Sequence, residues 1–227
     1  MRKSSGEADL RDFIRVMRDA DEVIDVTEPV TEEYQAPKMA AATDKLLYFH
    51  DLRGERAVMN VTATRRSLSL ALSIPESETV QKLSLASYNG EVIDDGTLSF
   101  SEVDLRRIPV MHHFPLDAGR YITSGIVFSS YDGVTNASIH RMLVHDEKSV
   151  VARLVEGRHT YALHQKALEA GERLPVAVVI GVHPAVTFAS CTRVPKGKEL
   201  IYAAELLGGE IRVRSCRNGV EVPDAEI

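Results

Sequence analysis

The stretch RYITSGIVFSSYDGVTNASIHRMLVHD, residues 120–146, contains two segments that are typical of β-strands. The first is RYITSGIVFSS and the second is SIHRMLVHD, so the residues between them, YDGVTN, must reverse the chain. The Asp132-Gly133 pair favours a tight reversal, because both residue types occur often in two-residue strand connections. We therefore predict two strands joined by a short turn, with a further strand in SVVARLV, residues 149–155.

Polar side chains crowd the beginning of the second strand and the residues just before it, because Asn136, Ser138, His140 and Arg141 fall within six positions. Successive side chains of a strand point to opposite faces, so the first three share one face, while Ile139 and Arg141 share the other. A strand that is polar on both faces is unusual for packing alone. Structural interpretations stay open, with Asn136 as a turn residue and Arg141 as an edge residue paired with an acid. The alternative is a binding site.

The rest of the chain mixes helices and strands without a regular strand–helix–strand repeat, which favours an α+β fold. Leu10, Phe13, Ile14 and Met17 have the spacing of one helix face. Further helices are expected at 32–45, where Pro37 should kink or split the helix, and at 65–88, 158–171, 183–192 (or a turn) and 197–209. Strands are expected at 22–30, 46–52, 57–64, 174–182 (buried) and 210–216, and turns at Asn89-Gly90 and Asp95-Gly96.

Composition restricts the class of protein. The chain has 227 residues, 44% of them apolar and 26% charged, as in ordinary soluble domains. The net charge of −6 argues against a nucleic acid or an anionic membrane as the main partner. We expect no membrane span and no signal peptide, since apolar runs such as LPVAVVIGV are short. With only Cys191 and Cys216 present, we expect a cytoplasmic protein, although a disulfide between them stays open.

Several residues downstream are candidates for binding an anion or a metal. Arg153 and Arg158 could hold phosphate or carboxylate oxygens, or form a solvated basic patch. His159 could bind a metal or phosphate, or cap the helix that it begins. Glu199 could be a ligand, or could simply favour the positive end of its helix. His112-His113 is not a chelating pair, because adjacent side chains of an extended segment diverge.

Motifs for nucleotide-binding loops, serine hydrolases and zinc proteases are absent from the sequence. Instead, the chain resembles the UbiD family of decarboxylases from about residue 9 onward, most specifically over 117–209. The stretches that carry this resemblance are DLRDFIRVM, DLRRIPVMHHFPLDAGRYITSGIV, TNASIHRM, LPVAVVIGVHPAV, VPKGKELIYAAELLGG and VPDAEI. The form S-I-H-R-M is most similar to archaeal-type members.

The resemblance implies a prenylated flavin mononucleotide (FMN) as cofactor. It also implies a divalent cation, usually Mn²⁺ with Mg²⁺ as the alternative, that bridges protein and flavin phosphate, often with K⁺ nearby. The implied metal ligands are Asn136, His159 and Glu199, a mostly hard set that suits these ions. His159 as a phosphate contact stays open. The implied cofactor-binding residues are Thr123, Asn136, Ser138, Ile139, His140, Arg141, Arg153, Arg158, His159 and Glu199.

The implied reaction is removal of CO₂ from an α,β-unsaturated or aromatic carboxylic acid, with the flavin as electron sink. Arg141 is the implied catalytic residue, because a guanidinium can hold a carboxylate flat over a ring. The substrate could be anhydromevalonate phosphate or a quinone precursor. A carboxylic acid must then return a proton to carbon.

The sequence departs from the family pattern in one respect. The family's acids that pair with the catalytic arginine follow the AEI stretch, and this sequence ends at Ile227. We therefore expect a tight hetero-oligomer, in which a C-terminal UbiD-like part is supplied in trans. The alternatives are a non-catalytic flavin-binding or assembly subunit, or an inactive fragment. For the fold, we expect an N-terminal α/β domain at 1–105 and part of a split β-barrel at 106–227.

Overall fold

The computed structural model describes residues 9–102 and 104–227. Its first element is α1 (Leu10–Asp19), and the Asp9 side chain caps it by accepting a hydrogen bond from the Asp12 amide at 2.7 Å. The helix buries the face that its spacing predicts, namely Leu10, Phe13, Ile14 and Met17. These side chains pack around Leu46 in a small core of their own.

The first sheet contains β1 (Val23–Val26), β2 (Leu46–Leu52) and β3 (Glu55–Met59). Strand β1 runs parallel to β2, which pairs antiparallel with β3. The connection between β1 and β2 contains α2 (Gln35–Ala41). Pro37 does not split this helix, because it lies in the first turn, where its missing N–H group is not needed.

The helix predicted for residues 65–88 is broken into three pieces. These are α3 (Arg65–Ala71), the 3₁₀ turn η1 (Glu76–Glu78) and α4 (Thr79–Ser84). Ser73 has a left-handed backbone with φ of 54°, and Pro75 follows two residues later. Proline lacks the N–H group that a continuous helix requires, so the single long helix was a wrong prediction.

Residues 91–97, expected to contain a turn, form β4 (Glu91–Thr97). This strand pairs in parallel with β11 (Glu210–Ser215), which in turn pairs antiparallel with β12 (Glu221–Pro223). A register shift between Val213 and Ser215 accommodates the Asp95-Gly96 turn signal within the ladder. Strand β4 lies within the expected N-terminal domain (1–105), yet it pairs with a strand near the C-terminus. The domain boundary at 105 therefore stays a prediction.

The reversal predicted at Asp132-Gly133 is present between β6 (Ile126–Tyr131) and β7 (Val134–Ile139). The two expected strands are each broken in two, and residues 134–136, expected in the reversal, already belong to β7. Asp132 and Gly133 have φ of 52° and 71°, as a two-residue turn between strands requires. Strand β10 (Val176–Val179) pairs with the other edge of β6. It was expected to be buried, but Val176 is 43% exposed because β10 lies at the edge of this sheet.

A neighbouring three-stranded sheet contains β5 (Tyr121–Ile122), β8 (Met142–Val144) and β9 (Val150–Ala152), all antiparallel, and η2 (Leu105–Arg107) precedes it. Helix α5 (His159–Glu169) follows β9 and packs against β6 and β7. The described residues thus form a mixed fold of four small sheets with no closed barrel among them, in keeping with the expected α+β class.

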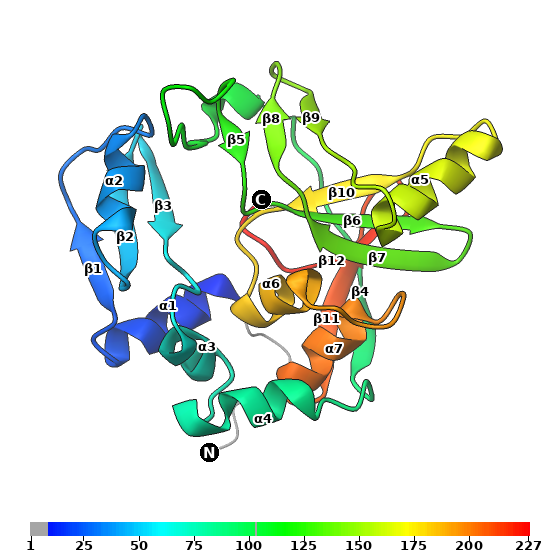
Figure 1. Ribbon diagram of the computed structural model, residues 1–227, viewed down its shortest axis with the longest axis horizontal. Helices are drawn as coiled ribbons and strands as arrows, with labels where there is room; N and C mark the ends of the chain where they lie inside the picture. Colours follow the sequence, from blue (N-terminus) through cyan, green and yellow to red (C-terminus); the bar gives the residue numbers. More distant parts are fainter. Residues whose placement is uncertain (1–8, 103) are drawn as a thin grey trace.

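The main core lies between the sheets of the second half. Helices α6 (Pro184–Cys191) and α7 (Glu199–Leu206) pack on each other and on β7, and Figure 1 shows them between the N-terminal sheet and the β6–β7 hairpin. Gly90 holds α7 close to β4, because a Cβ atom there would lie 2.5 Å from the Ile201 carbonyl oxygen. This close packing positions α7, whose first residue is Glu199. Both thiols, Cys191 and Cys216, are free.

His183 caps α6 from a buried position. Its Nδ1 accepts a hydrogen bond from the Ala185 amide at 3.2 Å, and its ring meets Phe13 of α1 edge-on. Burial lowers the pKa of His183 from 6.5 to about 4, because the charged ring would lose its hydration. The N-terminal helix and the main core therefore meet at a histidine that must be neutral.

This histidine should make folding sensitive to mild acid. A group whose pKa is depressed in the folded state stabilises the fold above its unfolded pKa, and this contribution is lost as the pH falls toward the folded value. We expect the free energy of unfolding to drop by about 2 kcal/mol between pH 7.5 and pH 5 because of His183. Urea unfolding at both pH values measures this. His183→Asn keeps a capping side chain without titration and should flatten the pH dependence, whereas an equal drop in the variant would contradict the assignment.

Candidate functional site

The fold brings together the three predicted metal ligands from three separate elements. Asn136 lies on β7 and is 4% exposed, while Glu199 is the first residue of α7 and is 6% exposed. Both line one small cavity. His159, the first residue of α5, approaches from the edge with its Nδ1 3.7 Å from Glu199 Oε1. An amide and a carboxylate thus line one cavity, with an imidazole beside the carboxylate, although Asn136 and Glu199 are 63 positions apart in sequence.

Glu199 is the one carboxylate among the buried residues of the described chain. Burial raises the pKa of this carboxyl group, and the nearby His159 and a backbone hydrogen bond only partly oppose that shift. A buried carboxylate that pairs with no lysine or arginine of the described chain is costly to keep ionised. A buried carboxylate of this kind is therefore typical of a group that binds a positively charged partner in the functional protein.

Ser129 faces the same cavity, and sequence inspection missed it. It lies on β6 opposite Asn136 in the strand register and is 1% exposed. Its Oγ is buried without a hydrogen-bond partner. An orphaned hydroxyl beside a carboxylate and an amide fits a site built for a cation or its water. The turn at Asp132-Gly133 does predict this pairing, because a two-residue connection sets 129 against 136.

The side chain of Asn136 is oriented by two hydroxyl groups. Its Nδ2 donates to Thr160 Oγ1 at 2.9 Å and to Ser138 Oγ at 3.1 Å. Both protons of the amide nitrogen are used in this way, so the carbonyl oxygen is the atom left to act as a ligand. Thr160, the second residue of α5 and 2% exposed, is the other contributor that sequence inspection missed. No sequence pattern marks it, because its role depends on how α5 packs against β7.

His140 belongs to the same hydrogen-bond network. Its Nδ1 donates to the Arg153 carbonyl oxygen at 3.1 Å. Its Nε2 lies 2.9 Å from Ser138 Oγ and 3.2 Å from Thr160 Oγ1. Ser138 and His140 thus interact with each other and with Thr160, and their predicted contact with a cofactor stays a prediction.

The remaining predicted residues are all exposed. Arg141 is exposed in the short connection between β7 and β8, and Ile139 at the end of β7 is also exposed. Thr123 is exposed between β5 and β6, and Arg153 and Arg158 are exposed on the segment that leads into α5. Their roles in binding or catalysis stay predictions.

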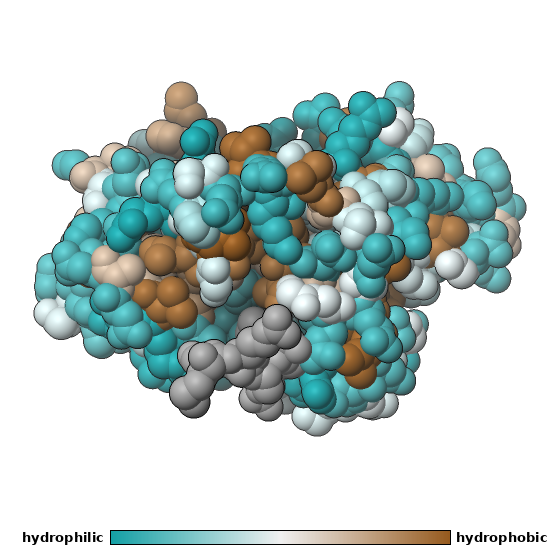
Figure 2. Space-filling model, turned by 90° about the horizontal axis from the view of Figure 1, so that it is seen from below, coloured by the Kyte–Doolittle hydropathy of each residue, from teal (hydrophilic) through white to brown (hydrophobic). Residues whose placement is uncertain are grey.

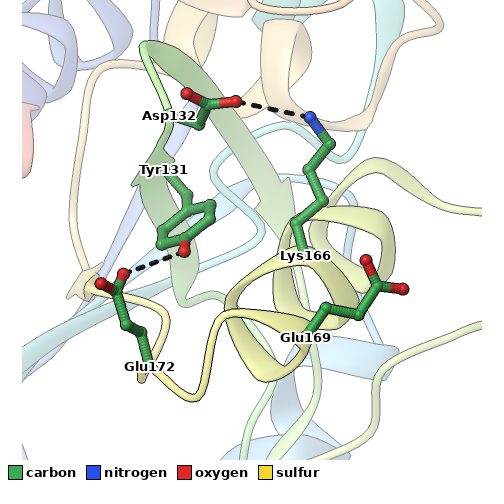
Figure 3. Close-up of a pocket in the computed structure, with 5 residues that line it drawn as sticks. All are labelled: Tyr131, Asp132, Lys166, Glu169 and Glu172. Carbon is green, nitrogen blue, oxygen red and sulfur yellow. Dashed lines mark hydrogen bonds and ion pairs between the residues drawn. The ribbon is translucent and has the colours of Figure 1, made fainter.

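A wider pocket of about 470 Å³ lies elsewhere, between the β6–β7 turn and the end of α5. Figure 3 shows Tyr131 donating to Glu172 and Lys166 paired with Asp132, with Glu169 beside them. The distances are 2.9 Å for the hydrogen bond and 3.6 Å for the ion pair. Three carboxylates against one lysine would repel a phosphate group, so this pocket is not the anion site that the arginines suggest.

Two further observations concern metals and membranes. In the described part of the chain, no three His, Cys, Asp or Glu side chains gather closely enough to hold a metal ion. The predicted set differs from such a group because one of its three members is an amide. Within residues 9–102 and 104–227, no helix has the length and apolarity to cross a bilayer.

Comparison with known proteins defines the family. Residues 14–86 match the profile of the 3-octaprenyl-4-hydroxybenzoate carboxy-lyase N-terminal domain. Residues 88–227 match that of the 3-octaprenyl-4-hydroxybenzoate carboxy-lyase Rift-related domain, named UbiD. The second match alone covers more than half of the chain, so the protein belongs to the UbiD family.

Among its relatives are two archaeal proteins named anhydromevalonate phosphate decarboxylase. The protein of Methanosarcina mazei is 43% identical over 222 residues, which are 96% of this chain and 53% of the relative. That of Archaeoglobus fulgidus is 44% identical over 183 residues, or 78% of this chain and 42% of the relative. The chain thus spans about half the length of the curated relatives that it matches.

Solved structures agree with this assignment. An evolved dimeric form of the UbiD-class enzyme HmfF from Pelotomaculum thermopropionicum, in complex with prenylated FMN, superposes with a TM-score of 0.86 at 27% identity. The match covers 96% of this chain and 55% of that one. The 3,4-dihydroxybenzoic acid decarboxylase of Klebsiella pneumoniae has a TM-score of 0.85 at 22% identity, covering 96% and 52%, and shows the shared fold.

Proposed function

We propose that the chain binds prenylated FMN through a divalent cation, Mn²⁺ or Mg²⁺, held by Asn136, His159 and Glu199. The cavity shared by Asn136, Glu199 and the orphaned hydroxyl of Ser129, with His159 3.7 Å from Glu199, carries the proposal. Oxygen and imidazole donors suit these cations, and the cation would neutralise the buried carboxylate. A K⁺ ion nearby is part of the same proposal.

The flavin would lie against the exposed rim of the cluster. Thr123, Ile139, Arg153 and Arg158 are exposed, so an apolar contact and two guanidinium groups would be available to the ring and the phosphate. The name of the HmfF structure, which contains prenylated FMN, supports this choice of cofactor.

The reaction would be removal of CO₂ from an α,β-unsaturated or aromatic carboxylic acid. The bound flavin would supply the electron sink, as in other cofactor-dependent decarboxylations. Arg141 would hold the substrate carboxylate with two parallel hydrogen bonds. The relatives' name favours anhydromevalonate phosphate as the substrate over a quinone precursor.

Activity would also require a second part of a UbiD-like protein, supplied in trans and carrying the acid that returns a proton to carbon. The chain spans about half the length of its relatives, which supports the proposal that a second polypeptide supplies the other half. Large apolar side chains are exposed, with Leu116 at 98%, Leu85 at 69% and Phe114 at 66%. Figure 2 shows apolar side chains gathered near the middle of one face between hydrophilic flanks. Such surfaces are typical of interfaces.

Co-expression with a C-terminal UbiD-like polypeptide tests the assembled function. We expect the two chains to elute together from gel filtration and to release CO₂ from an unsaturated acid when given prenylated FMN and Mn²⁺. A monomer near 25.1 kDa that turns over substrate alone would contradict the need for a partner. A tight complex that binds flavin and releases no CO₂ from any acid would favour a non-catalytic flavin-binding or assembly subunit instead.

A further inference from the structure

Asn136 can act as a metal ligand only through its oxygen, because the amide nitrogen has no lone pair to offer. The two ends of an amide have the same shape, so packing alone does not decide which end faces the cavity. Hydrogen-bond partners make that decision. The contacts of Asn136 therefore determine whether the site contains a ligand or a repelling N–H group.

The hydrogen-bond network around Asn136 has a defined direction. The Arg153 carbonyl oxygen can only accept, so His140 Nδ1 carries the proton, and in the neutral ring Nε2 must accept. One hydroxyl of the pair Ser138 and Thr160 donates to this Nε2. The other hydroxyl donates to its neighbour across 2.8 Å. Both hydroxyl protons are then used, and both oxygens still have lone pairs.

Those lone pairs accept the two protons of the Asn136 amide, so every donor in the network has an acceptor. With the amide reversed, its oxygen would need protons that the hydroxyls already donate. With the amide reversed, only the two hydroxyl protons can form hydrogen bonds within the network, which makes two bonds. The observed orientation makes four, two from the amide N–H groups and two from the hydroxyl groups. The network thus favours the orientation with Oδ1 away from the hydroxyls.

We propose that Thr160 is a positioning residue that turns the oxygen of Asn136 toward the metal site, with His140 setting the direction of the network. Thr160 Oγ1 lies within 3.2 Å of Asn136, Ser138 and His140, and Ser138 Oγ makes the equivalent contacts within 3.1 Å. Of the two hydroxyl groups, that of Thr160 makes the shorter contact with Asn136 and belongs to the more deeply buried residue. This inference rests on the proposed function, in which Asn136 binds the cation. Thr160, which lies on a helix and is not itself a ligand, thus determines which atom of Asn136 faces the metal.

Manganese binding to the metal-stripped full chain tests the inference. Free Mn²⁺ is measured by its electron paramagnetic resonance signal, with Mn²⁺ alone and with Mn²⁺ plus FMN. Thr160→Val keeps the shape and removes the hydroxyl, so Mn²⁺ affinity should fall about 10- to 100-fold, as for other residues that orient a ligand. Thr160→Ser restores the hydroxyl and should recover most of the affinity. Thr79→Val is the matched control, because Thr79 is also 2% exposed but lies on α4, and it should change nothing.

A second variant separates orientation from general stability. Asn136→Asp has an oxygen at both ends, so the direction of the network no longer matters. In the Asn136→Asp background, Thr160→Val should therefore lower the Mn²⁺ affinity by less than about threefold. A threonine with a merely structural role would not produce this coupling between the two positions. If Thr160→Val does not fold, Ser138→Ala removes the other acceptor and takes its place in the same cycle.

The outcomes distinguish the inference from the function on which it rests. Unchanged affinity in folded Thr160→Val, or the same loss in both backgrounds, would overturn the inference and leave the metal site intact. An unmodified chain that binds no Mn²⁺, with or without FMN, would overturn the proposed function and the inference together. Circular dichroism and melting temperature establish that each variant is folded.

Discussion

Replacing Arg141 with lysine should reduce turnover of the assembled enzyme by about a hundredfold or more while the chain still folds. Lysine keeps the positive charge, but it loses the planar pair of N–H groups that holds a carboxylate in one plane. Arg141 is exposed in the connection between β7 and β8. Its replacement should therefore cost little stability, so that any loss of turnover reflects its role in the reaction.

The measurement is CO₂ release by the assembled enzyme, with circular dichroism of each variant as a test of folding. Arg173→Lys is a suitable control, because Arg173 is exposed on the segment after α5, away from the cluster. It should retain full turnover. If Arg141→Lys stays within about threefold of the unmodified enzyme, Arg141 does not orient the carboxylate.

Replacing Glu199 with glutamine should have two opposite effects. The Mn²⁺ affinity should fall by more than about 100-fold, because a charged ligand is lost, and removing only an outer partner already costs up to that amount. Metal-depleted chain should become more stable, because Gln has the same shape and no charge to bury. The buried position of Glu199 is the reason for both effects.

The sign of the pH effect follows from the raised pKa of Glu199. A carboxyl group whose pKa is raised in the folded state favours folding most when it is protonated, so stability is lost as the pH rises through that value. The melting temperatures of the metal-depleted chain and of Glu199→Gln should be compared at a series of pH values. The variant should exceed the unmodified chain in stability by the largest margin at the highest pH. A variant that is equally stable at every pH, or that still binds Mn²⁺ tightly, would contradict the assignment.

Local signals in the sequence predict several elements of the fold. The Asp132-Gly133 turn sets the register of β6 and β7, and the glycine after α7 and the spacing along α1 predict those helices well. The strand β4 could not be predicted, because it pairs with β11 more than a hundred residues later and contains a turn signal of its own. The break after α3 depends on Pro75 together with a left-handed Ser73.

The candidate site likewise contains residues that the sequence indicates and residues that only the packing reveals. Asn136 and Glu199 lie in stretches that carry the family resemblance, and His159 follows from the same resemblance, so all three are indicated before any contact is known. Thr160 and the unpartnered Ser129 emerge only from packing, since a threonine in a helix and a serine in an apolar strand are common. Residues that complete or orient a site leave a weaker trace in sequence than the ligands themselves.

Titration of FMN with the metal-stripped chain, with and without Mn²⁺, tests the central claim most directly. The claim is that the cation joins the protein to the flavin phosphate, so flavin fluorescence should change with Mn²⁺ present and hardly change without it. The Mn²⁺ dependence should disappear in Glu199→Gln, which lacks the buried carboxylate. FMN binding that is equally tight without metal, or Mn²⁺-dependent binding that Glu199→Gln leaves unchanged, would contradict the account.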